Sequence, residues 1–184
     1  MSDVVVVDYA AGNTRSVRAA LARLGRSSDV SADARAILDA DFVILPGVGA
    51  ARSAMQHLKD TGAADALRQR FDANGAILGI CLGMQLALET SEEDGGVEGL
   101  GLLSGHVKRL EGDRVPRLGW AFVEPWGEAY YFAHSYVAAS PDAVASSDGV
   151  TVAVRSGPFL GVQFHPEKSG AAGLDFLEQC LSRA

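Results

Sequence analysis

The chain has 184 residues, of which 48% are hydrophobic and 21% are charged, with a formal net charge of −7. This length suits one well-buried domain rather than two, so we expect a single domain over residues 1–184, and the composition excludes a disordered chain. The sixteen Lys and Arg residues are scattered, which argues against a nucleic-acid binder, and no apolar run approaches the roughly 18 residues that span a bilayer.

The first 90 residues alternate short apolar runs with segments of helical periodicity. Four valines at 4–7 predict a buried strand, a loop follows over 8–13, and a helix then begins, with Asn13 as its cap and Gly25 just beyond its end. Further strands are expected at 28–30, at 41–45 and in the apolar run from residue 75, with helical segments at 31–38, 55–58, 63–71 and 82–88. This alternation predicts a parallel sheet with helices on its faces.

The strand at 41–45 ends abruptly at the segment Pro46-Gly47-Val48-Gly49. Proline cannot continue a strand ladder, and the two glycines permit unusual backbone angles. Open α/β sheets place ligands at loops that follow the carboxyl ends of parallel strands. This loop is therefore a candidate part of a binding site, although most Pro-Gly pairs are ordinary turns.

A second glycine-rich turn follows the strand that starts at residue 75, in the segment Gly79-Ile80-Cys81-Leu82-Gly83. This glycine spacing is typical of a nucleophile elbow, a tight strand-to-helix turn with no room for Cβ atoms beside the nucleophile, here with cysteine in place of serine. Such a turn would lift the Cys81 sulfur out of the sheet beside unpaired helix amides, which favour a thiolate and can receive an oxyanion. A lone cysteine in an apolar run is more often a small core residue, so the rest of the chain has to decide.

From Leu100 the pattern changes to strand-like runs separated by turns at glycine or proline. After an acidic, glycine-rich loop at 91–99, the expected strands cover 106–110, 120–123, 130–137, 151–155 and 159–164, and a helix at 169–183 closes the chain. We therefore expect an α/β fold with three layers, in which a mostly parallel central sheet is flanked by helices. The C-terminal half would add antiparallel strands at the sheet edge and return for a last central strand.

A histidine and a carboxylate stand two residues apart where the last strand ends, in Phe164-His165-Pro166-Glu167. In extended chain these two side chains point to the same side, and Pro166 biases His165 towards that conformation. Glu167 would then orient the ring through one nitrogen, while the other nitrogen addresses a nucleophile. A single histidine is more often structural, but its occurrence together with a cysteine elbow makes Cys81, His165 and Glu167 a candidate catalytic triad.

The cysteine elbow through Met84-Gln85, together with His165-Pro166-Glu167, resembles the class I (triad) glutamine amidotransferases. Within that class the chain resembles the glutaminase subunits of imidazole glycerol phosphate synthase, from histidine biosynthesis, over nearly its whole length. Four segments carry this closer resemblance: Gly12-Asn13 with Ser16, Leu45-Pro46-Gly47-Val48-Gly49, Tyr131-Phe132-Ala133-His134-Ser135-Tyr136, and residues 161–169. The triad indicates only the class, whereas these segments indicate the subfamily.

The resemblance implies an enzyme that hydrolyses L-glutamine to glutamate and ammonia through a cysteine thioester. Cys81 would attack the side-chain amide, His165 would protonate the departing ammonia and then activate water, and Glu167 would hold His165. The oxyanion would be bound by the Leu82 amide and by an amide of the loop Gly47-Val48-Gly49. The positions that hold substrate glutamine in relatives are here Gln85, Glu93, Ser135 and Tyr136.

The resemblance also implies a heterodimer with a (β/α)8-barrel cyclase, which uses the ammonia to make imidazole glycerol phosphate and an aminoimidazole carboxamide ribotide. Such a glutaminase is nearly idle until the synthase partner is bound. Asn13, Trp120 and Lys168 match positions that face the partner. One segment departs from the family pattern Pro-His-Met-Gly-Trp-Asn, because Arg117 stands for the histidine and Ala121 for the asparagine. This departure concerns docking and coupling rather than the triad.

Three other interpretations stay open on the sequence alone. They are the glutaminase subunit of another ammonia-using synthase, such as pyridoxal phosphate synthase, a non-catalytic glutaminase-like regulatory module, and a stand-alone cysteine hydrolase. The first usually has a different oxyanion loop, and the second usually loses a triad residue. Turnover measured with and without a partner separates all three.

Nothing in the sequence indicates a cofactor or a metal, because the four histidines form no ligand-spaced cluster and no phosphate loop or dinucleotide fingerprint is present. Cys81 and Cys180 suggest no disulfide framework, and Cys180, in the last helix, is given no chemical role. The start of the chain, Met1-Ser2-Asp3 and then the valine run, lacks the features of a signal peptide. We therefore expect a cytoplasmic enzyme that contacts neither nucleic acid nor membrane.

Overall fold

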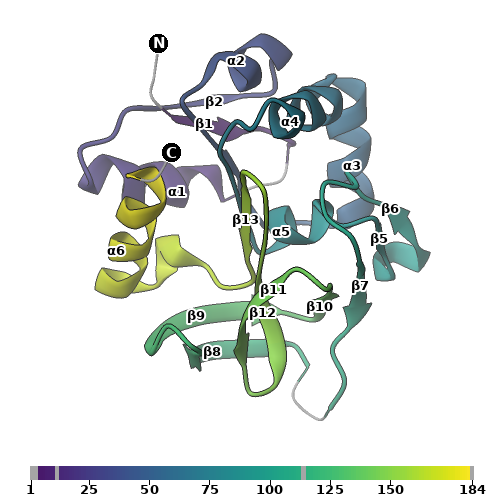
Figure 1. The fold of residues 1–184 in the computed structure, drawn as a ribbon, viewed down its shortest axis with the longest axis vertical. Coiled ribbons are helices and arrows are strands. Elements are labelled where there is room, and N and C mark those ends of the chain that lie inside the picture. Colours follow the sequence, from purple (N-terminus) through teal and green to yellow (C-terminus); the bar gives the residue numbers. More distant parts are fainter. Residues whose placement is uncertain (1–3, 11–12, 113–114, 183–184) are drawn as a thin grey trace.

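The computed structural model describes residues 4–10, 13–112 and 115–182, so the predicted Gly12, the first three residues and the predicted helix end at Arg183 lie outside the described part. Its centre is a seven-stranded sheet in the order β11-β12-β13-β4-β3-β1-β2. From one edge to the other these strands are β11 (Ala143–Ser147), β12 (Val150–Ser156), β13 (Phe159–Val162), β4 (Ile77–Ile80), β3 (Phe42–Leu45), β1 (Val4–Val7) and β2 (Ser28–Ser31). Five of these strands, β1, β2, β11, β12 and β13, are labelled in Figure 1. The run from β13 to β2 is parallel, and β12 and β11 add antiparallel strands at the edge.

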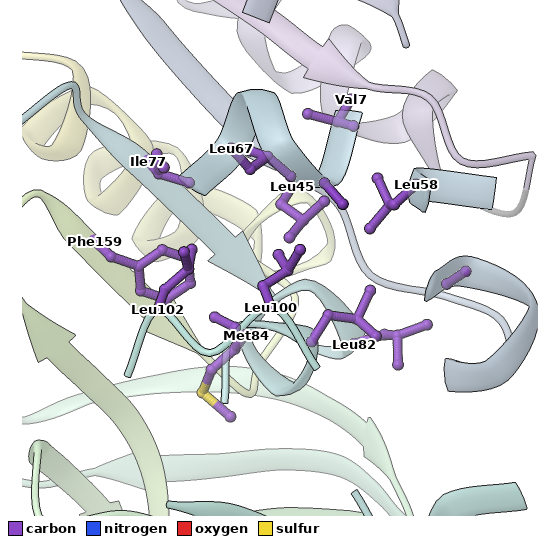
Figure 2. Close-up of a cluster of buried hydrophobic side chains, with 14 of the residues drawn as sticks. Val7, Leu45, Leu58, Leu67, Ile77, Leu82, Met84, Leu100, Leu102 and Phe159 are labelled. Carbon is purple, nitrogen blue, oxygen red and sulfur yellow. The ribbon is translucent and has the colours of Figure 1, made fainter. Parts of the chain in front are cut away.

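Helices cover both faces of this sheet, as the sequence predicts. Alternate residues of a strand point to opposite faces, so Val5 and Val7 pack with one set of helices and Val4 and Val6 with the other. The first set is α2 (Ala34–Asp39), α3 (Ala51–Asp60) and α4 (Ala63–Asp72), whose apolar core is shown in Figure 2. The second set is α1 (Thr14–Arg23) and α6 (Gly170–Leu181). Burial on both faces explains why the central strands are apolar at nearly every position.

The middle of the chain departs from the expected arrangement. The predicted strand at 130–137 is two strands, β9 (Glu128–His134) and β10 (Tyr136–Ala139), because the chain leaves one partner strand and joins another at Ser135. Among the described residues, β9 pairs with β8 (Arg117–Val123) in a separate two-stranded ribbon. β10 joins a four-stranded sheet with β7 (His106–Arg109), β5 (Thr90–Ser91) and β6 (Val97–Glu98). These strands therefore do not extend the central sheet, and the predicted loop at 91–99 contains β6 and a 3₁₀ helix, η1 (Glu93–Gly95).

Four neighbouring parallel strands, β1, β3, β4 and β13, end at the same edge of the sheet. The segments that follow them contain Asn13, Gly47, Cys81 and His165, which brings residues from both ends of the chain to one place. In the described part of the chain, the helices are all too short or too polar to cross a membrane.

Candidate active site

Cys81 occupies a strained turn between β4 and α5 (Leu82–Leu86). Its backbone has φ +49° and ψ −107°, in a region that side chains rarely adopt, and such strain in a folded protein is concentrated at functional sites. The flanking glycines are required by space, as the elbow interpretation predicts: a Cβ on Gly83 would lie 1.9 Å from the Leu45 carbonyl oxygen, and one on Gly79 would lie 2.6 Å from Phe159 Cζ. The helix after the turn is shorter than the predicted 82–88.

The loop after β3 packs directly against this turn. A Cβ on Gly47 would lie 1.7 Å from the Ile80 carbonyl oxygen and 2.6 Å from the Leu82 nitrogen, so the two predicted oxyanion segments are neighbours. The buried hydroxyl of Tyr9 anchors the loop by donating a hydrogen bond to the Pro46 carbonyl. Burial raises the pKa of Tyr9, as does the nearby charge of Cys81, and a hydrogen bond with the Val48 backbone partly offsets the rise.

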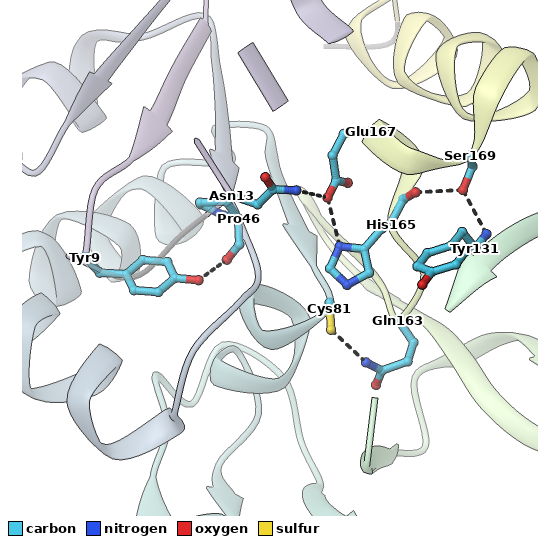
Figure 3. A network of polar contacts seen from close by, with 9 residues as sticks. All are labelled: Tyr9, Asn13, Pro46, Cys81, Tyr131, Gln163, His165, Glu167 and Ser169. Carbon is cyan, nitrogen blue, oxygen red and sulfur yellow. Dashed lines mark hydrogen bonds and ion pairs between the residues drawn. The ribbon is translucent and has the colours of Figure 1, made fainter. Parts of the chain in front are cut away.

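The His165 ring lies between Glu167, which it contacts, and Cys81 (Figure 3). Its Nδ1 lies 2.8 Å from Glu167 Oε1, and the two side chains are only 2% and 1% exposed. Burial alone would lower the pKa of His165, but hydrogen bonds to Cys81 and Glu167, and the charges of both, raise it to about 9. The ring is therefore an imidazolium at neutral pH when its two partners are anionic. The predicted contact is present, and His165 itself is extended as predicted, with φ −104° and ψ 94°. The chain does not stay extended beyond it, because Glu167 lies in a 3₁₀ turn, η2 (Pro166–Lys168).

Two further side chains hold this pair in place. Asn13 stands at the N-cap position of α1, but its side chain makes no cap hydrogen bond; instead Nδ2 donates to Glu167 Oε1 at 2.8 Å. Asn13 is therefore the N-cap residue, as predicted, but its side chain serves Glu167 rather than the helix. Buried Ser169 donates to the His165 carbonyl oxygen at 2.6 Å and accepts the Tyr131 N–H at 2.9 Å, which fixes the backbone that carries the ring.

The residues predicted to hold substrate occupy different environments. Gln85 is buried, and its Nε2 donates to the Tyr136 carbonyl oxygen and to Gln163 Oε1, each at 3.0 Å. The Ser135 carbonyl oxygen accepts the Leu110 N–H at 2.8 Å, between β9 and β10. Glu93 lies in η1 beside the start of α3, where burial and Asp94 raise its pKa and the Ala51 backbone partly offsets the rise. The structure thus links Gln85 and Tyr136 to each other, while Glu93 belongs to the neighbouring loop.

Gln163 is a candidate site residue that sequence reasoning missed. It is completely buried, and its Nε2 donates to Cys81 Sγ at 3.4 Å (Figure 3). A polar amide within the apolar run 159–164 was the available signal, because buried amides are almost always hydrogen-bonded. Tyr9 was missed as well and gave a weaker signal, since tyrosine is common in cores.

The residues predicted to face a partner gather around η2. Asn13 bonds Glu167 within it, Lys168 is exposed in it, and a Cβ on Gly170 would lie 4.0 Å from Trp120 Cη2. Arg117 instead points inward: its guanidinium lies 4.7 Å over the Phe132 ring, and Nη2 bonds Ser147 Oγ at 2.8 Å and Asp148 Oδ2 at 2.6 Å. Arg117 is thus committed to contacts within its own chain.

Comparisons with known proteins agree with this geometry. Residues 5–184 match the family model of class I glutamine amidotransferases. The chain is 42% identical to the imidazole glycerol phosphate synthase subunit HisH of Exiguobacterium sibiricum, covering 96% of this chain and 93% of that protein. It is also 42% identical to HisH of Carboxydothermus hydrogenoformans, covering 95% of this chain and 96% of that protein.

Solved structures show the same fold at lower sequence identity. A crystal structure of a glutamine amidotransferase superposes with a TM-score of 0.82 at 23% identity, covering 98% of this chain and 99% of the other. A chain in the structure of PurLQS from Thermotoga maritima superposes with a TM-score of 0.70 at 21% identity, covering 100% and 99%. These two structures support the fold, and the sequence matches carry the relationship further: the chain belongs to the class I glutamine amidotransferase family and, within it, to the HisH subunits.

Proposed function

We propose that this chain is the glutaminase subunit of an imidazole glycerol phosphate synthase, which hydrolyses L-glutamine and passes the ammonia to a cyclase subunit. The observation that supports it most is the alignment of Cys81, His165 and Glu167 at a strained elbow, in a chain 42% identical to HisH subunits. A nucleophile, a base and an orienting carboxylate within hydrogen-bond reach are the arrangement that acyl transfer through a covalent intermediate needs.

Acylation begins from a thiolate at Cys81 paired with the imidazolium of His165. An electron pair of the sulfur forms a bond to the side-chain carbonyl carbon of glutamine, and the carbonyl π electrons move to its oxygen. When this oxyanion collapses, the C–N bond breaks, and the imidazolium gives its proton to the departing nitrogen, so that ammonia leaves and a glutamyl thioester remains. The raised pKa of His165 keeps that proton available until the leaving group takes it.

The oxyanion would form between the elbow and the loop after β3. The Leu82 N–H and one N–H of Gly47-Val48-Gly49 are the proposed donors, because the two segments touch beside Cys81. Removing one such donor costs about 10²- to 10³-fold in turnover. The Tyr9 hydroxyl hydrogen-bonds the backbone of both Pro46 and Val48. Tyr9, which follows β1, therefore helps to set the backbone direction of the loop.

In deacylation the proton moves in the opposite direction, from water to His165. Neutral His165 takes a proton from water as the water oxygen bonds the thioester carbon, and the C–S bond then breaks to release glutamate and restore the thiolate. Glu167 holds Nδ1 throughout, so that the ring's other nitrogen faces the reacting atoms.

The ammonia needs a partner, because free ammonia near neutral pH is mostly protonated and ammonium has no lone pair with which to attack. β8 carries an exposed apolar stripe for such a partner: Leu118, Trp120 and Phe122 alternate along it and are 66%, 58% and 69% exposed. Large apolar side chains gathered on one face mark protein–protein interfaces. We propose that a (β/α)8-barrel cyclase covers this stripe together with Asn13 and Lys168, forming a heterodimer.

Two further features of the proposal follow from the chain itself. The whole length, 1–184, is one glutaminase domain, because the site draws on segments from both ends of the chain. The nucleophile must remain a reduced thiol, which suits the cytoplasm.

The deciding experiment measures glutamate release from glutamine by the purified chain, first alone and then with the cyclase and its ribotide ligand. Low activity alone and strong stimulation in the mixture, abolished by Cys81→Ala, are the expected results. Equal activity with and without the partner would instead identify a free-standing glutaminase. A stable complex with no turnover under any condition would identify a regulatory module.

A further inference from the structure

The amide of Gln163 touches the sulfur of Cys81, in addition to the contact that the triad assigns to His165. Gln163 has no exposed surface, and its Nε2 lies 3.4 Å from Sγ, a hydrogen-bonding separation for the large sulfur atom (Figure 3). A buried amide next to a nucleophile can stabilise its anion only if the donor end of the amide, rather than its carbonyl end, faces the sulfur.

A chain of hydrogen bonds fixes which end that is. The Tyr136 carbonyl oxygen can only accept, so the end of the Gln85 amide 3.0 Å away must be Nε2. That amino group can only donate, so the Gln163 atom 3.0 Å from it must be Oε1. Nε2 of Gln163 is then left facing Cys81. The orientation of the Gln163 amide therefore follows from the Tyr136 carbonyl, not from an arbitrary assignment of the amide oxygen and nitrogen.

The backbone holds Gln163 and Cys81 side by side. Val162 stands opposite Ile80 in the parallel pair of β13 and β4, so the next residues of the two strands are neighbours. The Cys81 N–H donates to the Val162 carbonyl oxygen at 2.7 Å, and the Gln163 N–H donates to the Val152 carbonyl oxygen at 2.8 Å. Neither backbone can move away without breaking one of these hydrogen bonds.

We propose that Gln163 is a further catalytic residue, which donates a hydrogen bond to the Cys81 thiolate while Gln85 and Tyr136 keep its donor end turned to the sulfur. This inference rests on the proposed function, in which Cys81 is the nucleophile. A thiolate with N–H donors from both His165 and Gln163 is stabilised and held in one direction, which leaves its remaining electron pair for the substrate carbonyl. Gln85 therefore acts as a positioning residue for Gln163.

The test follows the pH dependence of Cys81 alkylation by iodoacetamide in the full chain, read by mass spectrometry of the peptide that contains Cys81. Gln163→Met keeps the side-chain length but removes the donor, so the midpoint of the profile should move up by about one pH unit, with about ten-fold slower alkylation below the midpoint. The kcat for glutamine in the cyclase complex should fall at neutral pH and recover as the pH is raised. Gln179→Met, at an exposed glutamine of α6, is the matched control and should leave both profiles in place.

A profile for Gln163→Met that superimposes on the parent's, with thermal unfolding showing a folded variant, would overturn the proposal. If Gln163→Met does not fold, Gln85→Met is the deciding variant. It keeps Gln163 beside Cys81 but removes the hydrogen bond that orients the Gln163 amide, so we expect a smaller upward shift of the alkylation midpoint. An unchanged profile in Gln85→Met would likewise contradict the proposal that Gln85 fixes the orientation of the Gln163 amide. Failure of the proposed function looks different: Cys81→Ala would still release glutamate, whatever the alkylation profiles show.

Discussion

Asn13 and Glu167 lie 154 positions apart in the sequence, and the Asn13 amide donates to Glu167 Oε1 at 2.8 Å. The same oxygen accepts the bond from His165 Nδ1, also at 2.8 Å, so two donors fix one carboxylate oxygen. The other oxygen, Oε2, is buried without a hydrogen-bond partner among the described residues. The direction of the carboxylate, and through it the direction of the His165 ring, therefore depends on a residue placed by the first strand and helix.

The first prediction concerns this contact. Asn13→Ala removes one donor to a buried carboxylate, and we expect kcat for glutamate release to fall about ten-fold, the equivalent of roughly 1.4 kcal/mol. Asn13→Asp should cost more, because a second carboxylate would face Glu167. Steady-state kinetics in the cyclase complex measures both effects, and Gln56→Ala, at an exposed glutamine that bonds Asp60, is the control. Unchanged kcat in Asn13→Ala would show that His165 alone positions Glu167.

A second prediction concerns the contact between the loop and the elbow. Gly47→Ala places a methyl group where backbone atoms of Ile80 and Leu82 already lie, so the loop must move away from Cys81. We expect a loss of at least about 10²-fold in glutaminase turnover, since an oxyanion donor is displaced. Gly25→Ala is a matched control, because its φ of +71° costs about 1 kcal/mol but, apart from its chain neighbours, no atom of the described residues lies within 4 Å of the new methyl. If Gly47→Ala were as active as Gly25→Ala, the loop after β3 would have no part in binding the oxyanion.

The central strands and the elbow could be predicted from the sequence because their signals are local. The four valines of β1 are buried on both faces, and Gly79 and Gly83 are required by atoms that the turn itself brings close. The predicted contact between His165 and Glu167 is found, and His165 is extended as predicted, although the chain turns into a 3₁₀ helix from Pro166. Residues two apart in the sequence can touch in either backbone conformation. The contact could therefore be predicted although the turn at Pro166 was not.

The rest depends on partners that are distant in the chain. β11 escapes prediction because Ala143–Ser147 lacks an apolar alternation and becomes a strand by pairing with β12. The role of Asn13 depends on Glu167, and that of Gln163 on Gln85 and Tyr136, none of which is a neighbour in sequence. The sequence pattern places Arg117 near the partner side, whereas its ion pair with Asp148 is set by the turn between β11 and β12.

A third prediction concerns the anchor of the loop. Tyr9→Phe removes the hydrogen bond to the Pro46 carbonyl and the contact with the Val48 backbone, so the chain should lose about 1–2 kcal/mol of unfolding free energy. A loop with less restraint samples more backbone directions, and we expect glutamate release without the partner to rise by up to about ten-fold. Urea unfolding and steady-state assays with and without the cyclase check the two effects. A fall in partner-free turnover would show that Tyr9 supports the active loop rather than restraining it.

A fourth prediction concerns the exposed stripe on β8. Trp120→Ala and Phe122→Ala should each raise the Kd for the cyclase about ten-fold or more, because large apolar side chains at the centre of an interface dominate its binding energy. Their effect on unfolding should stay small, since both side chains are mostly exposed. Calorimetric titration measures the affinity. Val144→Ala, at an exposed valine of β11, should leave the Kd unchanged; equal Kd values for all three variants would place the partner on another face.

The last prediction is a pH dependence of stability that originates at His134. The pKa of this histidine is lowered to about 4, mainly by burial; the hydrogen bond with the Tyr136 carbonyl partly offsets the fall, and the charges of Arg117 and His165 add to it. Its Nε2 is buried without a hydrogen-bond partner among the described residues, which leaves nothing there to stabilise a proton. Between pH 6.5 and 4 the unfolded chain therefore takes up a proton that the folded chain refuses, so acidification through this window should cost about 3 kcal/mol of unfolding free energy.

His165 acts in a different window, which makes the two histidines separable. Its folded pKa of about 9 lies above the unfolded value, so its contribution is fully present below pH 6.5 and is lost as the pH rises to 9. His134→Asn can keep a donor near the Tyr136 carbonyl but has no titrating group, and urea unfolding from pH 4 to 7 should show a flatter slope than in the parent. The raised pKa of Glu93 affects the pH dependence of stability equally in the parent and in His134→Asn, so its effect cancels when the two slopes are compared. If the two slopes coincide below pH 6.5, the proton is taken up in the folded state and the buried Nε2 has a partner in solution.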